Sequence, residues 1–166
     1  KLYKLNKELS ATPKTIEATI SLPKSVKGAA GVIFGNYNES YKSPLDISVE
    51  SGGRIKLYFK NGSKTVSKVF KTDIRSDSGT VHIALTLSGK TAVLYVNGEK
   101  SETAKVKVSL PKTMSQLKIG GDNRSKNTNY FKGKLYFVHM YSDARTSTEL
   151  KKDRLYVSPE ASSLIY

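Results

Sequence analysis

The sequence predicts an all-β fold in which two antiparallel sheets stack as a β-sandwich, with one short helix near the C-terminus. Short apolar stretches recur along the 166 residues at the spacing expected of a sandwich or barrel. Apolar and polar residues alternate within these stretches, so each sheet buries one face and leaves the other in water. Turn signals such as Asn97-Gly98 separate the stretches.

Ten strands are expected in chain order. They cover residues 15–22, 31–37, 45–49, 55–59, 66–70, 80–87, 91–96, 105–110, 116–119 and 134–140. Pro23 closes the first strand and Pro111 the eighth, since proline has no N–H for a sheet ladder. Ser51-Gly52-Gly53 predicts a hairpin between the third and fourth strands. The stretch 105–110 is included because its valines and leucine alternate with polar residues.

A capping box predicts the helix. In Thr146-Ser147-Thr148-Glu149, the Thr146 side chain can accept a hydrogen bond from a backbone amide of the first turn. The Glu149 side chain can in turn accept one from the backbone amide of Thr146. The helix is expected over 146–154, as a short surface element. We place one domain over 1–156 and a packed tail or the start of a linker over 157–166.

The composition limits the partners of the protein. The net charge is +14, which favours anionic partners such as acidic polysaccharide. The lysines are spread over the polar faces of strands, without a basic run or nucleic-acid motif, so nucleic-acid binding is not predicted. Cysteine is absent, which excludes disulfides and thiolate metal sites. No apolar run is long enough to span a membrane. Because the chain starts at Lys1 without a signal-like segment, we expect it to be cut from a longer protein.

Four stretches resemble a known family in their order along the chain. They are TIEATISLPK at 15–24, TVHIALTLSGKTAVLYVNGEK at 80–100, LKIGGDN at 117–123 and FKGKLYFVHMYSDARTSTEL at 131–150. The likeness is to the concanavalin A-like jelly rolls, specifically the laminin G-like domains of secreted bacterial proteins, which are related to pentraxins. It implies a jelly-roll recognition module of a larger secreted or cell-surface protein, next to neighbouring domains of that protein.

The chain departs from the family pattern at two positions. Val81 stands where the family has an aromatic residue before His82, and Phe137 stands where an acidic residue is common. Tryptophan is absent from the whole sequence. The resemblance is therefore to a divergent member.

Catalysis is not predicted. Related jelly-roll glycoside hydrolases place carboxylates at alternate positions of one strand, in the pattern E-x-D-x-(x)-E, and this chain has no such run. His82 and His139 are single histidines on strands without a nucleophile nearby in sequence. We interpret the protein as a non-enzyme.

The resemblance places ligands of relatives in two loops, which map here to 36–44 and 121–130. Calcium requires six to eight oxygens, several of them from carboxylates. The loops offer Asp122, Asn123 and Glu39 as weak candidates, but Arg124 and Lys126 oppose a cation. No cofactor is therefore assigned, and calcium stays an alternative.

Carbohydrate is the favoured ligand, because the same loops combine tyrosines with amide, carboxylate and guanidinium groups. The predicted ligand-binding residues are Asn36, Tyr37, Asn38, Tyr41, Asp122, Asn123, Arg124, Asn127 and Tyr130. The positive charge favours an anionic glycan. Two alternatives remain open: these side chains only support the loops, or the domain is a structural or protein-binding adhesion module without a glycan ligand.

Overall fold

The computed structural model describes residues 3–4, 12–23, 28–37, 44–75, 79–111, 116–122 and 129–154. Eleven strands and one helix lie in this part of the chain. One sheet contains β1 (Tyr3–Lys4), β3 (Gly31–Gly35), β4 (Leu45–Glu50), β5 (Arg54–Asn61), β6 (Lys64–Asp73) and β10 (Lys118–Ile119). The other contains β2 (Thr15–Ser21), β7 (Val81–Ser88), β8 (Thr91–Val96), β9 (Glu99–Lys105) and β11 (Lys134–Tyr141).

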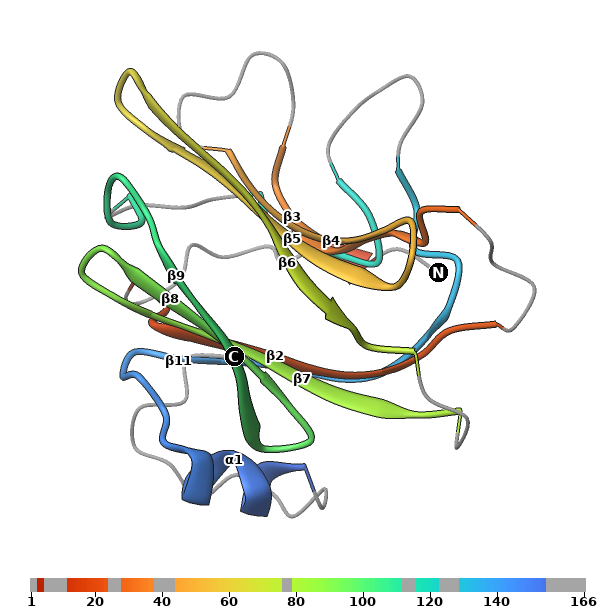
Figure 1. Ribbon diagram of the computed structural model, residues 1–166. Coiled ribbons are helices and arrows are strands. Elements are labelled where there is room, and N and C mark those ends of the chain that lie inside the picture. The colour runs from red at the N-terminus through yellow and green to blue at the C-terminus, as the bar shows by residue number, and fades with distance from the viewer. Residues whose placement is uncertain are drawn as a thin grey trace.

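The two sheets form the predicted antiparallel sandwich, which Figure 1 shows as two stacked layers. The six-stranded sheet has the order β1-β10-β3-β4-β5-β6, and the five-stranded sheet has the order β11-β2-β7-β8-β9. Strands distant in sequence become neighbours in both, since β10 pairs with β3 and β11 pairs with β2. The all-β fold expected from the alternating pattern is thus confirmed.

The hydrophobic core lies between the sheets and is built from alternate residues of each strand. In β2, Ile16, Ala18 and Ile20 are buried against it. Phe59 and Phe70 fill the interior from the six-stranded sheet and are completely buried. Fully burying a side chain of this size stabilises the fold by roughly 1.5–3 kcal/mol. The other half of each strand therefore faces outward, where a functional site can form.

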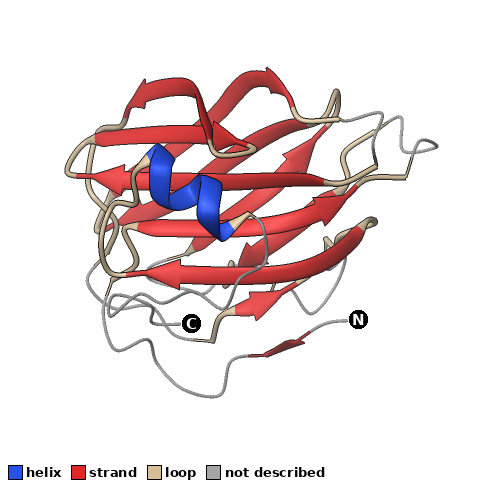
Figure 2. Cartoon of the chain, turned by 90° about the horizontal axis from the view of Figure 1, so that it is seen from below, coloured by secondary structure: helices blue, strands red, loops and turns tan. Residues whose placement is uncertain are grey.

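Helix α1 (Ser147–Asp153) lies against the outer face of the five-stranded sheet (Figures 1 and 2). The predicted capping box is present, because Thr146 accepts from the amide of Glu149 and the Glu149 carboxylate accepts from the amide of Thr146. Leu150 is completely buried and anchors the helix. No helix in the described ranges is long and apolar enough to cross a membrane.

The predicted strand over 105–110 is wrong. The Asn97-Gly98 turn fixes the register of the hairpin, so that Glu99 pairs with Val96 and Lys105 with Thr91. The strand is therefore β9, which ends where the prediction began. Only Ala104 of β9 is buried, because β9 is an edge strand. Its sequence is mostly polar and therefore lacks the alternating apolar pattern that predicts a strand. The two-residue β1 was also not predicted, and the boundary expected at residue 156 lies outside the described residues.

Replacing Thr146 by alanine tests the capping box. The substitution removes the side-chain acceptor of the Glu149 amide. We expect the free energy of unfolding to fall by about 1 kcal/mol, as for other N-cap threonines. Urea denaturation measures the change. Thr148→Ala is the matched control, because Thr148 is exposed within the helix and alanine is the better helix former. Equal losses from the two variants would contradict a role for the cap.

Candidate functional site

A polar groove crosses the outer face of the six-stranded sheet. Its volume is about 260 Å³. It is lined by Val32, Tyr37, Asp46, Ser48, Glu50, Lys56, Tyr58 and Asn129. We call this set the polar groove. It combines aromatic rings with hydroxyl, carboxylate, amide and ammonium groups.

The floor of the polar groove comes from the outward residues of β4 and β5. Across the ladder, Asp46 pairs with Tyr58, Ser48 with Lys56, and Glu50 with Arg54. Ser48 Oγ donates to Glu50 Oε1 at 3.2 Å, while Lys56 Nζ lies 3.7 Å from the same oxygen. Both charged side chains are about one-third exposed, so this ion pair is weak and its groups remain accessible to a ligand.

Two tyrosines form the aromatic part of the groove. The rings of Tyr37 and Tyr58 meet edge to face, with centroids 5.5 Å apart and an interplanar angle of 83°. Burial raises the pKa of Tyr58, and the charges of Tyr37 and Asp46 raise it further. The amide of Tyr37 donates to Asp46 Oδ1 at 3.4 Å. Tyr58 therefore keeps its phenol proton and can act as a hydrogen-bond donor.

The end of β3 is shaped to hold Asp46 in place. A Cβ atom at Gly35 would lie 2.0 Å from Asp46 Oδ1 and 2.9 Å from the carbonyl oxygen of Leu45. Only glycine therefore leaves room for the carboxylate across the ladder. The next residue, Asn36, is completely buried, and its Oδ1 accepts from the amide of Leu45 at 2.6 Å. The local sequence Gly35-Asn36 thus connects β3 to β4 and positions one side of the groove.

The segment after residue 128 reaches the other side of the groove. The amide of Val32 donates to the carbonyl of Asn129 at 3.0 Å. Gly31 has φ of 92°, and a Cβ there would lie 2.1 Å from the carbonyl oxygen of Tyr130. The glycine lets this segment lie directly along β3. The described ends of the two predicted loops, residues 36–37 and 129–130, therefore both lie at β3.

The predicted ligand-binding residues divide into three groups. Tyr37 lines the groove, and Tyr130 lies beside its lining residue Asn129 with 55% of its surface exposed. Asn36 and Asp122 are completely buried, so solvent does not reach them and a sugar would not contact them. The remaining residues lie outside the described part of the chain: Asn38, Tyr41, Asn123, Arg124 and Asn127, together with the calcium candidate Glu39.

Most of the groove was not predicted from the sequence. Ser48, Glu50, Lys56 and Tyr58 lie on strands, whereas the predicted residues lie in loops. Their signal was present as the polar half of the alternating pattern in 45–49 and 55–59. The pairing of these two strands, which the Ser51-Gly53 turn predicts, would have placed them on one face.

The described residues do not fit a calcium site. The Asp122 carboxyl group is fully buried, and Lys118 Nζ donates to its backbone oxygen at 3.3 Å. An ammonium at this point opposes a second cation. Nor do the described residues contain three histidine, aspartate or glutamate side chains arranged to hold a metal ion.

A second cluster of polar side chains is buried on the five-stranded sheet. Glu17 on β2 is completely buried at its side chain and accepts three hydrogen bonds. The donors are His82 Nε2 at 3.1 Å, His139 Nδ1 at 3.0 Å and the Tyr141 hydroxyl at 2.9 Å. Burial alone would raise the pKa of Glu17, but the bonds from His139, His82 and Tyr141 and the charge of His82 lower it to about 2. Glu17 is therefore ionised at neutral pH.

Arg145 connects this buried cluster to helix α1. The Arg145 guanidinium lies 4.6 Å from the centroid of the Tyr141 ring and contacts Asp153 on α1 at 3.0 Å. The pKa of Asp153 is raised by burial and by the nearby Glu17. His82 and His139 were predicted to be single, unconnected histidines, but the structure joins them through one carboxylate. The cluster links three strands to α1.

Comparisons with known proteins agree with this architecture. The sequence model of the concanavalin A-like lectin/glucanases superfamily matches residues 5–151. A candidate carbohydrate-binding protein from Bacteroides ovatus is 20% identical, with a TM-score of 0.60 over 99% of this chain and 49% of that chain. This chain thus spans about half of the Bacteroides protein. None of the curated proteins matches this chain.

Two further solved structures share the fold. The CBM40 of the Ruminococcus gnavus IT-sialidase, bound to α2,3-sialyllactose, is 15% identical with a TM-score of 0.63, over 92% of this chain and 96% of that chain. Domains LG4-5 of the mouse laminin alpha1 chain are 15% identical with a TM-score of 0.62, over 89% of this chain and 40% of that chain. At these identities the likeness concerns the fold.

Acid denaturation tests the Glu17 cluster. Because the folded-state pKa of Glu17 is about 2 against an ordinary 4.5, its contribution to stability is fully present above 4.5 and is lost as pH falls through 2. Between pH 6 and pH 3, this loss amounts to about 2 kcal/mol. Glu17→Gln should remove that part of the pH dependence, as measured by urea unfolding at both values.

Glu99→Gln is the matched control for this experiment. Glu99 lies on the edge strand β9 with 69% of its side chain exposed, and it pairs with Lys151 at the surface. We expect this variant to keep the wild-type pH dependence. A Glu17→Gln variant that also keeps it would contradict the assignment of acid sensitivity to the buried carboxylate.

Proposed function

The chain belongs to the concanavalin A-like lectin/glucanase superfamily, and on this premise we propose that it is a non-catalytic carbohydrate-binding module of a secreted or cell-surface protein. The polar groove is its glycan site. The observation that carries the proposal is the meeting of Tyr37 and Tyr58 over a floor of carboxylate, hydroxyl and ammonium groups. The module covers 1–156, and 157–166 form a packed tail or the start of a linker.

The chemistry of the groove suits a sugar. The C–H face of a pyranose packs on aromatic rings, which Tyr37 and Tyr58 supply. Its hydroxyl groups donate to the carboxylates of Asp46 and Glu50 and accept from Lys56. Binding is reversible, because it needs only contacts and hydrogen bonds. The rigid pair β4–β5 holds these groups in position before the ligand arrives, which reduces the entropy that binding costs.

Anionic glycans are the proposed class within carbohydrates. The net charge of +14 attracts polyanions to the whole molecule. Arg54, Lys56 and Lys60 occur at alternate positions of β5, so they share the outward face beside the groove. The Ruminococcus module with this fold is bound to an acidic sugar, α2,3-sialyllactose, which supports the same class for this chain.

Glycan-array binding followed by titration tests the groove. Tyr58→Ala removes one ring and the hydroxyl from the floor, and we expect the affinity for the best glycan to fall at least about tenfold. Tyr95→Ala is the matched control, because Tyr95 lies on β8 in the other sheet. Binding to protein partners with no glycan bound at any ionic strength would contradict the proposal. That result would favour the protein-binding adhesion alternative.

A salt series tests the anionic class. Between about 50 mM and about 500 mM salt, we expect the affinity for an acidic oligosaccharide to fall steadily, since salt screens exposed charges. Calorimetry measures the dissociation constant at each concentration. The neutral oligosaccharide of the same length is the control and should change little. Equal salt dependence for both ligands would contradict a preference for anionic glycans.

A further inference from the structure

A second cavity lies on the opposite face of the sandwich from the polar groove. Its volume is about 360 Å³. It is lined by Thr19, Thr80, Tyr136, Phe137 and Arg154. We call it the helix-side pocket, because Arg154 is the C-cap of α1 and the other residues lie on or beside the five-stranded sheet. The pocket shares no lining residue with the polar groove.

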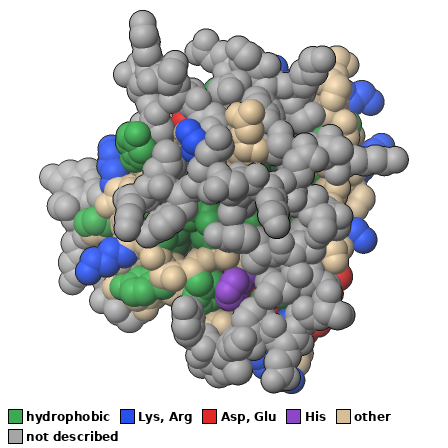
Figure 3. Space-filling model, turned by 180° about the vertical axis from the view of Figure 1, so that it is seen from behind, with side chains coloured by type: hydrophobic (Ala, Val, Ile, Leu, Met, Phe, Trp, Pro, Cys, Tyr) green, Lys and Arg blue, Asp and Glu red, His purple; other side chains and the backbone are tan. Residues whose placement is uncertain are grey.

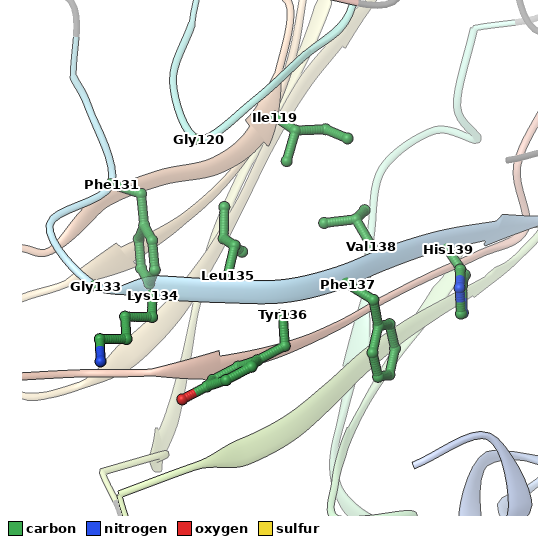
Figure 4. Close-up of a pocket in the computed structure, with 10 residues that line it drawn as sticks. All are labelled: Ile119, Gly120, Phe131, Gly133, Lys134, Leu135, Tyr136, Phe137, Val138 and His139. Carbon is green, nitrogen blue, oxygen red and sulfur yellow. The ribbon is translucent and has the colours of Figure 1, made fainter. Parts of the chain in front are cut away.

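A β-bulge builds the aromatic wall of the helix-side pocket. Leu135 pairs with Ile20 and Phe137 pairs with Thr19, so Tyr136 is the extra residue of β11. Figure 4 shows Tyr136, Phe137 and His139 projecting from one side of β11, away from Leu135 and Val138. Two consecutive residues thus present aromatic rings on the same face, which a regular strand would not allow.

The wall is exposed at one end and fixed at the other. Tyr136 has 50% of its surface exposed. The Phe137 ring stacks on His139 with centroids 4.6 Å apart, and Glu17 holds His139 through its Nδ1. Figure 3 shows a histidine at the surface beside hydrophobic side chains. The Phe137 end of the wall is therefore held in place before a ligand binds, and the Tyr136 ring is accessible to a ligand.

Thr19, which lines the pocket, and His82, its neighbour across the ladder, each carry a buried polar atom without a partner among the described residues. Phe137, Thr19 and His82 form one row across β11, β2 and β7. Within the described residues, Thr19 Oγ1 and His82 Nδ1 are buried and make no hydrogen bond. His82 Nε2 is already used on Glu17. Buried polar atoms almost always have partners, so this row indicates a hydroxyl-bearing molecule at this point.

Arg154 gives the pocket a cation. Its Nη1 donates to the carbonyl of Asn97 at 3.2 Å, which fixes the guanidinium beside the start of β7. Among the residues that the structure describes, no carboxylate pairs with Arg154 or lines the pocket. The polar groove differs, because it carries Asp46 and Glu50. A guanidinium with free N–H groups suits a carboxylate ligand.

We propose that the helix-side pocket binds a carboxylate-bearing sugar of the uronic acid type. Its ring packs on Tyr136 and Phe137, its hydroxyls bond to Thr19 and Thr80, and its carboxylate pairs with Arg154. The proposal does not depend on the polar groove. The protein then carries two sites on opposite faces, and an acidic polysaccharide is bound at the helix-side pocket through single uronic acid residues.

NMR titration of the ¹⁵N-labelled protein tests the proposal. The probes are methyl β-glucuronide and its neutral match, methyl β-glucoside. We expect the glucuronide to shift the amides of Thr19, Thr80 and Tyr136, and the glucoside to bind there at least about tenfold more weakly. Shifts confined to β4 and β5, equal binding of both probes, or an ordered water only in the pocket would each overturn the proposal.

Matched variants separate binding from folding. Arg154→Gln keeps a donor for the Asn97 carbonyl but removes the charge, so the glucuronide affinity should fall at least about tenfold and the glucoside affinity should not change. Arg54→Gln, on the other sheet, is the control and should leave the pocket shifts unchanged. An Arg154→Gln variant that binds the glucuronide as wild type would overturn the role of Arg154.

Two more variants address the floor and the independence of the sites. Thr19→Val removes the unpaired hydroxyl at nearly constant volume, so thermal stability should stay or rise while the affinity for the glucuronide falls severalfold. Unchanged affinity would overturn the role of the floor. Tyr58→Ala weakens binding at the polar groove but should preserve the shifts at Thr19 and Tyr136. Their loss in this variant would overturn the claim that the two sites are separate.

Discussion

The two-residue period of the strands is the constraint on which the structure depends. Each strand gives one side-chain row to the space between the sheets, and that row must be apolar to stabilise the fold. The outward row is then free to vary. In β5 the inward residues are completely buried, while Lys56 and Tyr58 face outward and line the polar groove. Fold and site are thus carried by alternate residues of the same strand.

Glu17 is the exception to this division. It lies on an outward row, yet it is buried, and a buried charge is costly unless it is hydrogen-bonded. The donors from His82, His139 and Tyr141 meet that requirement. They come from strands far apart in sequence, so the cluster forms only when β2, β7 and β11 are correctly paired. A charge in this position therefore selects one register and one docking position for the helix.

What the sequence could predict follows from the range of each interaction. Local signals were sufficient for the hairpin turns, the Thr146 capping box and most strands, because neighbours in the chain determine them. The strand predicted over 105–110 was wrong because the Asn97-Gly98 turn, and not hydrophobicity, fixes where an edge strand pairs. The site depended on longer-range pairing. Asn36 reads as a ligand residue in sequence, but its amide supports the Leu45 backbone instead.

Charge is the property that local patterns describe least well. The net charge of +14 suggests one uniform anion-binding surface, but the structure distributes charge by face. On the six-stranded sheet, the acidic row of β4 lies beside the basic row of β5, so a ligand there meets both signs. On the five-stranded sheet, the carboxylate of Glu17 is buried and Arg154 remains at the surface. The two candidate sites therefore differ in the charges that line them, although one composition supplies both.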